Sequence, residues 1–238
     1  MKRMGGGFGG KETRSVFVAL CAAVAAHKCN APVKICLDRD VDMSITGTRH
    51  PFVCQYTAAA SKTTGKLAFL DCQLYSDGGC SLDLSGPIMD RALFHIDNVY
   101  KWPVLSVQGV VCKTNLPSNT AFRGFGGPQA MVFTETILEH LASELAAQRT
   151  SSSSSSSSSA WSSLELRQMN LYKEGELTHF DQPLVGWHVP RCIQEAIASS
   201  DYHARAAAVA EFNKVPGGAI FTLLWRIEPQ RQLHFDHL

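Results

Sequence analysis

The sequence has almost no excess of charge of either sign. Its 238 residues include 22 Lys and Arg against 21 Asp and Glu, which gives a formal net charge of +1 with His neutral. Proteins that bind nucleic acids or anionic membrane surfaces usually carry a clustered basic excess. We therefore expect no nucleic acid and no membrane among the partners of this chain.

Long apolar segments are also missing. No run reaches the roughly 18 residues that a membrane-spanning helix needs, and no charged and then apolar signal segment follows Met1. Apolar residues nevertheless make up 45% of the chain. That content is enough to form a substantial core in one or two domains.

The eight cysteines lack both the C-x-x-C spacing of many metal sites and the spacing of an iron–sulfur cluster. Without a signal segment a disulfide framework is not expected, so we interpret them as reduced thiols in an intracellular compartment. Cys21 and Cys36 lie in apolar runs and are expected to be buried. The histidines also lack metal-ligand spacing and are interpreted as solvated or packed side chains. Those considered are His95, His179, His188 and His203.

The spacing of apolar residues predicts a mixed α+β fold, in which helices surround a sheet. Strands are predicted over 33–37, 52–60, 66–76 and 104–114, the second and third as a hairpin, and a charged loop over 38–43. Helices are predicted over 12–28, 87–100 (or an irregular segment there), 131–145 and 190–214. The first helix is apolar nearly all round, so it is expected to lie in the core, with Glu12 in its first turn.

Nine consecutive serines over 151–159 interrupt the chain. Such a run buries no apolar surface and behaves as a flexible linker. We therefore interpret 149–163 as a linker or insertion between 1–148 and a helical segment over 164–214. The tail over 215–238 contains the strand-like stretch FTLLWRI, for which no partner strand is evident.

The first glycine-rich stretch, GGGFGGKE, covers Gly5 to Glu12. Glycine accepts positive φ angles and lets backbone N–H groups approach a ligand closely, often an anion. The nearest generic pattern is the P-loop, but Glu12 stands where that motif needs a metal-binding hydroxyl. Three interpretations follow from the residues: a P-loop, an inert flexible loop, and a different loop that cradles an anion.

A second stretch, AFRGFGG over 121–127, repeats the Gly-Phe-Gly-Gly theme. Gln129 and Pro128 exclude the dinucleotide fingerprint G-x-G-x-x-G. The two stretches lie far apart in the chain, so they either converge on one ligand or form two unrelated tight turns. Their spacing does not decide between these interpretations.

The chain also contains four longer motifs, RMGGGFGGKETR, LDRDVDMSITGTRHPF, RALFHIDN and CKTNLPSNTAFRGFGGPQ. Together they closely resemble the molybdenum-cofactor domain of the xanthine dehydrogenase and aldehyde oxidase family. The resemblance runs over 2–141, resumes over 164–214, and stops at Val215 as if a gene-model error had intervened. It implies a partial molybdenum-cofactor-binding domain, with 1–148 as the N-terminal part of the molybdopterin-binding domain and 164–214 as its helical continuation.

The resemblance implies which residues bind the molybdenum–molybdopterin cofactor. The loop beside the metal would consist of Gly6, Gly7, Phe8 and Gly9. Phe8 would lie near the molybdenum without being a side-chain ligand. Arg123 resembles an arginine that lies near both the cofactor and the substrate pocket.

Glu12 and Arg91 resemble the xanthine dehydrogenase branch of the family, since aldehyde oxidases generally have apolar residues at both positions. This gives both residues catalytic and substrate-binding roles. A carboxylate and a guanidinium can pair with a purine edge, and Arg91 would stabilise the negative charge that develops on the heterocycle. Arg123 and Phe125 would complete the substrate pocket, with Phe125 stacked on the purine. From the residues alone, Glu12 could instead be a helix-dipole carboxylate and Arg91 part of a surface ion pair.

The resemblance implies a molybdenum hydroxylase that oxidises hypoxanthine and xanthine to urate. In the full-length parent it further implies FAD, [2Fe–2S] clusters, a homodimer and a cytoplasmic location, with peroxisomal association as an alternative. The family's glutamate base and second stacking phenylalanine lie beyond this chain, so the chain alone is expected to be inactive. Two alternatives stay open: an aldehyde oxidase, and a non-catalytic fragment that only binds partners.

Overall fold

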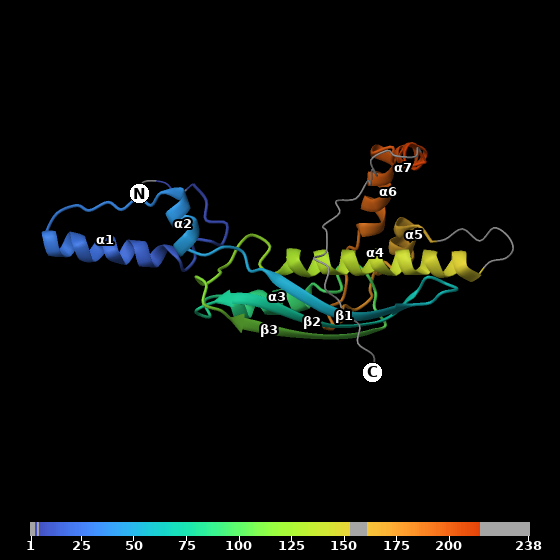
Figure 1. Ribbon diagram of the computed structural model, residues 1–238, viewed down its shortest axis with the longest axis horizontal. Coiled ribbons are helices and arrows are strands. Elements are labelled where there is room, and N and C mark those ends of the chain that lie inside the picture. The colour runs from blue at the N-terminus through green and yellow to red at the C-terminus, as the bar shows by residue number, and fades with distance from the viewer. Residues whose placement is uncertain (1–2, 4, 153–160, 215–238) are drawn as a thin grey trace. The chain divides into compact units, whose positions relative to one another are not determined.

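The computed structural model describes residues 3, 5–152 and 161–214 (Figure 1). They fall into two compact units, the first ending at Gly186 and the second beginning at Trp187. This boundary does not coincide with the serine tract, and the predicted domain limits remain a prediction. Most of that tract and the whole tail over 215–238, including its strand-like stretch, lie outside the described residues.

A three-stranded mixed sheet forms the first unit's centre. Strand β1 (Phe52–Ala60) pairs antiparallel with β2 (Leu67–Gly79), which confirms the predicted hairpin. Strand β2 pairs in parallel with β3 (Val104–Lys113). Parallel neighbours need a crossover, and helix α3 (Ser85–Phe94) lies in that connection. The predicted α+β class, with both the third strand and the short helix before it, is therefore confirmed.

The core lies between one face of the sheet and two helices. Leu70, Cys72 and Leu74 alternate along β2 and are fully buried. They belong to one apolar cluster with residues of α3 and of α4 (Gly127–Ser152), the helix predicted over 131–145. Helix α3 contacts β3 and α4 contacts β1. This one-sided cover is typical of a sheet whose side chains alternate between core and solvent.

Helix α5 (Ser163–Met169) follows the serine tract and packs on α4. Its Arg167 is largely buried, with Nε 2.7 Å from Glu135 Oε2 and Nη1 2.8 Å from Glu139 Oε1, both on α4. The hydroxyl of Tyr100 donates to the same Glu135 carboxylate at 2.8 Å. Because every charge in this group has a partner, the ion pairs hold α5 against α4.

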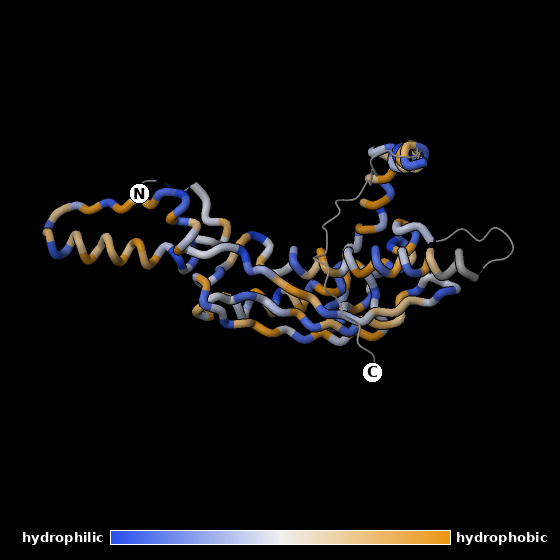
Figure 2. Tube along the Cα trace, viewed as in Figure 1, coloured by the Kyte–Doolittle hydropathy of each residue, from blue (hydrophilic) through white to orange (hydrophobic). Residues whose placement is uncertain are grey.

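Helix α1 (Ser15–Cys29) differs from the prediction in two respects: its side chains are not buried, and it begins later in the sequence. None of its residues is buried, and Phe17 is 61% exposed, so the predicted core position is wrong. Figure 2 shows apolar residues along its whole length. An apolar helix is buried only where another layer covers it, and the described residues supply none. The expected burial of Cys21 is wrong for the same reason. The helix also begins at Ser15, so Glu12 is not in its first turn.

The segment between α1 and β1 was also predicted incorrectly. The expected strand over 33–37 has no regular secondary structure, and Cys36 within it is exposed rather than buried. The expected loop over 38–43 contains helix α2 (Arg39–Ile45). Acidic residues in its first turn, which had suggested a loop, instead suit the positive end of the helix dipole.

The described part of the second unit contains two helices, α6 (Val189–Ser199) and α7 (Tyr202–Phe212). A single helix over 190–214 was expected, and that expectation is wrong. Asp201 adopts φ +50°, a left-handed conformation that ends the first helix before the second begins. Among all described residues, no helix is both long and apolar enough to cross a membrane.

Candidate functional site

The two glycine-rich stretches, here called loop 1 (residues 5–12) and loop 2 (residues 121–127), contact each other. A Cβ added at Gly9 would lie 3.0 Å from the carbonyl oxygen of Ala121. One added at Gly10 would lie 3.0 Å from the ring of Phe122. The loops are therefore not two unrelated turns, although their spacing in the sequence left that possible.

The loops share the backbone conformation of one Phe-Gly pair as well as a sequence. Phe8 and Phe125 both have φ +51°, which is uncommon for a residue with a Cβ. The glycine after each, Gly9 or Gly126, also has a positive φ, of +87° and +92° respectively. Two matching left-handed Phe-Gly turns thus lie side by side.

Gly126 also brings loop 2 close to α3. A Cβ there would lie 2.1 Å from the carbonyl oxygen of Ile88, a distance that backbone cannot tolerate. Helix α3, which carries Arg91, is thereby held directly against loop 2. The two loops and α3 together form the candidate site.

We expect Gly126→Ala to lower the free energy of unfolding by about 3 kcal/mol, since a left-handed alanine and an overpacked contact each cost about 1–3 kcal/mol. Urea unfolding of the chain measures this loss. Gly86→Ala in α3 is the matched control, because a Cβ there would meet nothing within 4 Å. A loss at Gly126 no larger than the loss at Gly86 would contradict the prediction.

Backbone N–H groups in both loops lack protein acceptors. Within the part of the chain that the structure describes, no hydrogen bond is donated by the amides of residues 6–10. In loop 2 the same holds for the amides of residues 122–124 and of Gly126. Successive free amides in glycine-rich backbone form a concave site for an anion or an oxygen-rich group.

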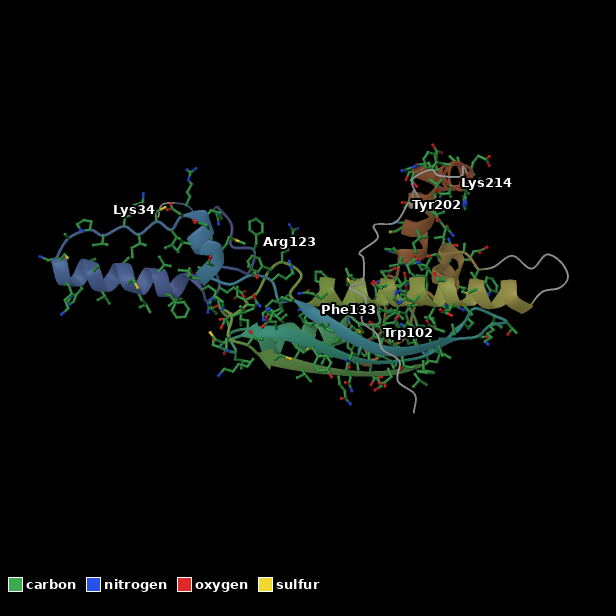
Figure 3. The ribbon with its side chains drawn as sticks, in the orientation of Figure 1. Lys34, Trp102, Arg123, Phe133, Tyr202 and Lys214 are labelled. Atoms are coloured by element: carbon green, nitrogen blue, oxygen red, sulfur yellow. The ribbon has the colours of Figure 1, made fainter. Side chains whose placement is uncertain are left out.

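The charged residues predicted for the site belong to loop 1, to α3 and to loop 2. Glu12 is exposed, and its N–H donates to Gly9 O at 3.1 Å. Arg91 is exposed in the last turn of α3. Arg123 is exposed, and its carbonyl oxygen accepts from Arg49 Nη2 at 2.7 Å. Figure 3 shows the Arg123 side chain on loop 2, extending away from the sheet.

None of these three charged side chains forms an ion pair or hydrogen bond with another described residue. The two interpretations from the residues alone, a dipole carboxylate for Glu12 and an ion pair for Arg91, therefore find no contact in their favour. Phe125 is half-buried, whereas Phe8 is 64% exposed. The arrangement thus offers free charge, free amides and aromatic surface in one neighbourhood.

Asp83 connects the segments of the site, and sequence reasoning missed it. Its Oδ1 accepts from Thr13 Oγ1 at 2.7 Å, and its Oδ2 from Thr120 Oγ1 at 2.6 Å. Burial opposes ionisation, but the hydrogen bonds from Thr120 and Thr13 and the nearby charge of Arg14 outweigh it and lower the pKa of Asp83. A lone aspartate in a loop carries no sequence signal for such a role.

His50 was likewise not singled out from the sequence. It is 2% exposed, its Nε2 lies 2.6 Å from Ser85 Oγ, and its carbonyl oxygen accepts from Gln129 Nε2 at 3.3 Å. With Gln129, Phe122 and Phe125 it lines a small pocket under loop 2. Burial lowers the pKa of His50, although the neighbouring backbone of Thr120 and nearby carboxylates act in the opposite direction.

The lowered pKa of His50 predicts acid sensitivity. Below pH 6.5, the ordinary His pKa, the unfolded chain binds a proton at this position that the folded chain resists. The free energy of unfolding should therefore decrease as the pH falls through that value. We expect His50→Gln to remove the part of this pH dependence that arises from His50, between about pH 5 and 7, as measured by urea unfolding at each pH. His27→Gln, at an exposed position of α1, should leave the pH profile unchanged. Identical slopes for both variants would contradict the prediction.

Among the described residues, no three His, Cys, Asp or Glu side chains gather as a set of metal ligands. The described residues of this chain would therefore hold a metal-containing cofactor by other means than a set of side-chain metal ligands. The free amides and glycine backbone suit the remaining part of such a cofactor, namely its oxygen-rich or anionic groups.

Comparison with known proteins finds a matching family model and similar sequences. The model of the molybdopterin cofactor-binding domain matches residues 1–151. The xanthine dehydrogenase/oxidases of Felis catus and Rattus norvegicus are 51% and 52% identical to this chain over 214 residues. The xanthine dehydrogenase of Dictyostelium discoideum is 46% identical. Each match covers 90% of this chain but only 15% of the relative, so the chain spans a small part of their length.

Solved structures show the same fold. The aldehyde oxidoreductase from Desulfovibrio gigas superposes with a TM-score of 0.71 at 27% identity, covering 89% of this chain and 21% of that chain. Reconstituted CO dehydrogenase from Oligotropha carboxidovorans gives a TM-score of 0.71 at 24% identity, covering 89% of this chain and 25% of that chain. At that identity the likeness concerns the fold alone.

Proposed function

Because this chain belongs to the molybdopterin cofactor-binding domain family, we propose that it forms part of the cofactor and substrate site of a molybdenum hydroxylase that oxidises hypoxanthine and xanthine to urate. Identities of 43–52% to xanthine dehydrogenases support the purine substrate. One observation carries the proposal: two glycine loops with matching left-handed Phe-Gly pairs lie in contact, and the amides of residues 6–10, 122–124 and 126 have no acceptor among the described residues.

The residues present fit a molybdopterin cofactor. The backbone of Gly6, Gly7, Phe8 and Gly9 would hold it from loop 1, and Arg123 would approach it from loop 2. The absence of Cβ atoms lets amides reach its oxygen-rich groups without steric interference. When bound, the cofactor would supply the two-electron oxidation chemistry that no side chain of this chain provides.

Four side chains would bind and orient the purine. Glu12 and Arg91 would pair with donors and acceptors at the purine edge, which fixes the ring's orientation. Arg91 would also stabilise the negative charge that develops on the heterocycle in the transition state. Phe125 would stack on the ring, and Arg123 would approach it from loop 2. All four belong to segments that meet at the candidate site.

Other properties belong to the full-length parent. We propose that the parent also contains FAD and [2Fe–2S] clusters, forms a homodimer, and acts in the cytoplasm or in association with peroxisomes. The residue that deprotonates the attacking oxygen would also lie in another part of the parent. The isolated chain should therefore show no turnover.

The test is to purify the full-length parent and to compare urate formation from xanthine with oxidation of an aromatic aldehyde. We expect kcat/KM to favour xanthine, and we expect no turnover of either substrate by the 238-residue chain. A clear preference for the aldehyde would favour the aldehyde oxidase alternative. Turnover by the isolated chain would refute the assignment of the base to another part of the parent.

A further inference from the structure

One carboxylate links residues that adjoin all three segments of the candidate site. Asp83 accepts short hydrogen bonds from Thr13, the residue after Glu12, and from Thr120, the residue before loop 2. Asp83 itself lies two residues before α3, the helix that carries Arg91. The side chain thus joins segments that are 70 and 37 residues away in the sequence.

The geometry at Asp83 is closely constrained. The two oxygen–oxygen distances, 2.7 and 2.6 Å, are those of charge-assisted hydrogen bonds. The backbone has φ +42°, a left-handed value that aspartate adopts more readily than most residues with a Cβ.

We propose that Asp83 is a positioning residue that sets the separation of loop 1 from loop 2 and aligns both with α3. The two oxygens of one carboxylate are rigidly spaced, so they fix the Thr13 and Thr120 hydroxyls relative to each other. Loop 1 in particular is rich in glycine and none of its residues is buried, so it has little side-chain packing of its own to fix it. The functional part of this inference rests on the proposed function, while the structural part does not.

A neighbouring carboxylate provides a matched comparison. Asp77 accepts from Thr114 Oγ1 at 2.7 Å and from the amide of Gly79 at 2.9 Å. The threonine–carboxylate bond is of the same kind as those at Asp83, although one oxygen of Asp77 accepts both bonds, and these partners lie at the ends of β2 and β3 rather than next to either loop. Loss of the Thr114 bond should therefore leave the spacing of the two loops unchanged.

The structural test is hydrogen exchange of the full chain in three single variants, Thr13→Val, Thr120→Val and Thr114→Val, and in the double variant Thr13→Val/Thr120→Val. Loss of either bond to Asp83 breaks the bridge, so each single variant should raise the exchange of the hydrogen-bonded loop amides, those of Glu12, Phe125 and Gly127, by about tenfold or more. The double variant should add little to this, and Thr114→Val should match the wild type. Fully additive effects, or equal effects of all three single variants, would overturn the proposal.

The functional test uses the full-length parent with Asp83→Ala and Asp83→Asn. Misplacement of the loops by about 1 Å should lower kcat for xanthine on the order of 100-fold in Asp83→Ala, with a smaller change in KM. Asp83→Asn should retain part of kcat, because its amide can accept from one threonine and donate to the other. If kcat stays at the wild-type value in both variants, the positioning role is wrong. If the wild-type parent does not oxidise xanthine, the proposed function is wrong, and the exchange experiment still decides about Asp83.

Discussion

Arg91→Met in the full-length parent is expected to lower kcat/KM for xanthine by about 100- to 1,000-fold, the usual cost of removing one preorganised group that stabilises transition-state charge. The loss should fall mainly on kcat, since the negative charge on the heterocycle develops during the reaction rather than on binding. Steady-state kinetics of urate formation measures both constants.

The exposure of Arg91 makes this result easy to interpret. Its side chain has no ion pair or hydrogen bond with any described residue, so Arg91→Met should change the free energy of unfolding by less than about 0.5 kcal/mol. Arg205→Met, at an exposed position of α7, is the matched control and should keep wild-type kinetics. A kcat/KM within about threefold of the wild type would remove Arg91 from the proposed mechanism.

The strands of the sheet could be predicted from the sequence, whereas the exposure of α1 could not. Strands β1, β2 and β3 follow from β-branched runs and turn residues, because each of those signals is local. The helical character of 12–28 is local too, whereas its burial depends on a second layer, which the described residues do not supply. Asp201 shows a related limit. Aspartate occurs both within helices and at their ends, and only the surrounding structure determines which of these it adopts at a given position.

The candidate site, too, could be predicted from the sequence only in part. Resemblance to a family identified Glu12, Arg91 and the two glycine loops, because those residues stand in long motifs. Contact between the loops was not predictable, since it depends on the crossover that brings Asp83 beside Thr13 and Thr120. Single polar residues such as Asp83 belong to no motif, so only the tertiary structure reveals their role.

Glu12→Val is expected to reverse the substrate preference of the full-length parent. Removing the carboxylate leaves the polar edge of a bound purine unpaired, so kcat/KM for xanthine should fall on the order of 1,000-fold or more. An aromatic aldehyde has no such edge, and its kcat/KM should change by less than about tenfold. Glu12→Gln, which keeps the size and one acceptor oxygen, should lie between these limits for xanthine.

The ratio of the two kcat/KM values is the quantity to measure, because a general loss of folding or of cofactor lowers both equally. Glu12 is exposed and has no side-chain partner in the described residues, so the free energy of unfolding should stay within about 0.5 kcal/mol of the wild type. Glu144→Val, at an exposed position of α4, controls for the loss of a surface carboxylate. If both substrates lose activity in parallel, Glu12 acts on the site as a whole. A change in the ratio confined to Glu12→Val would instead assign it to recognition of the purine edge.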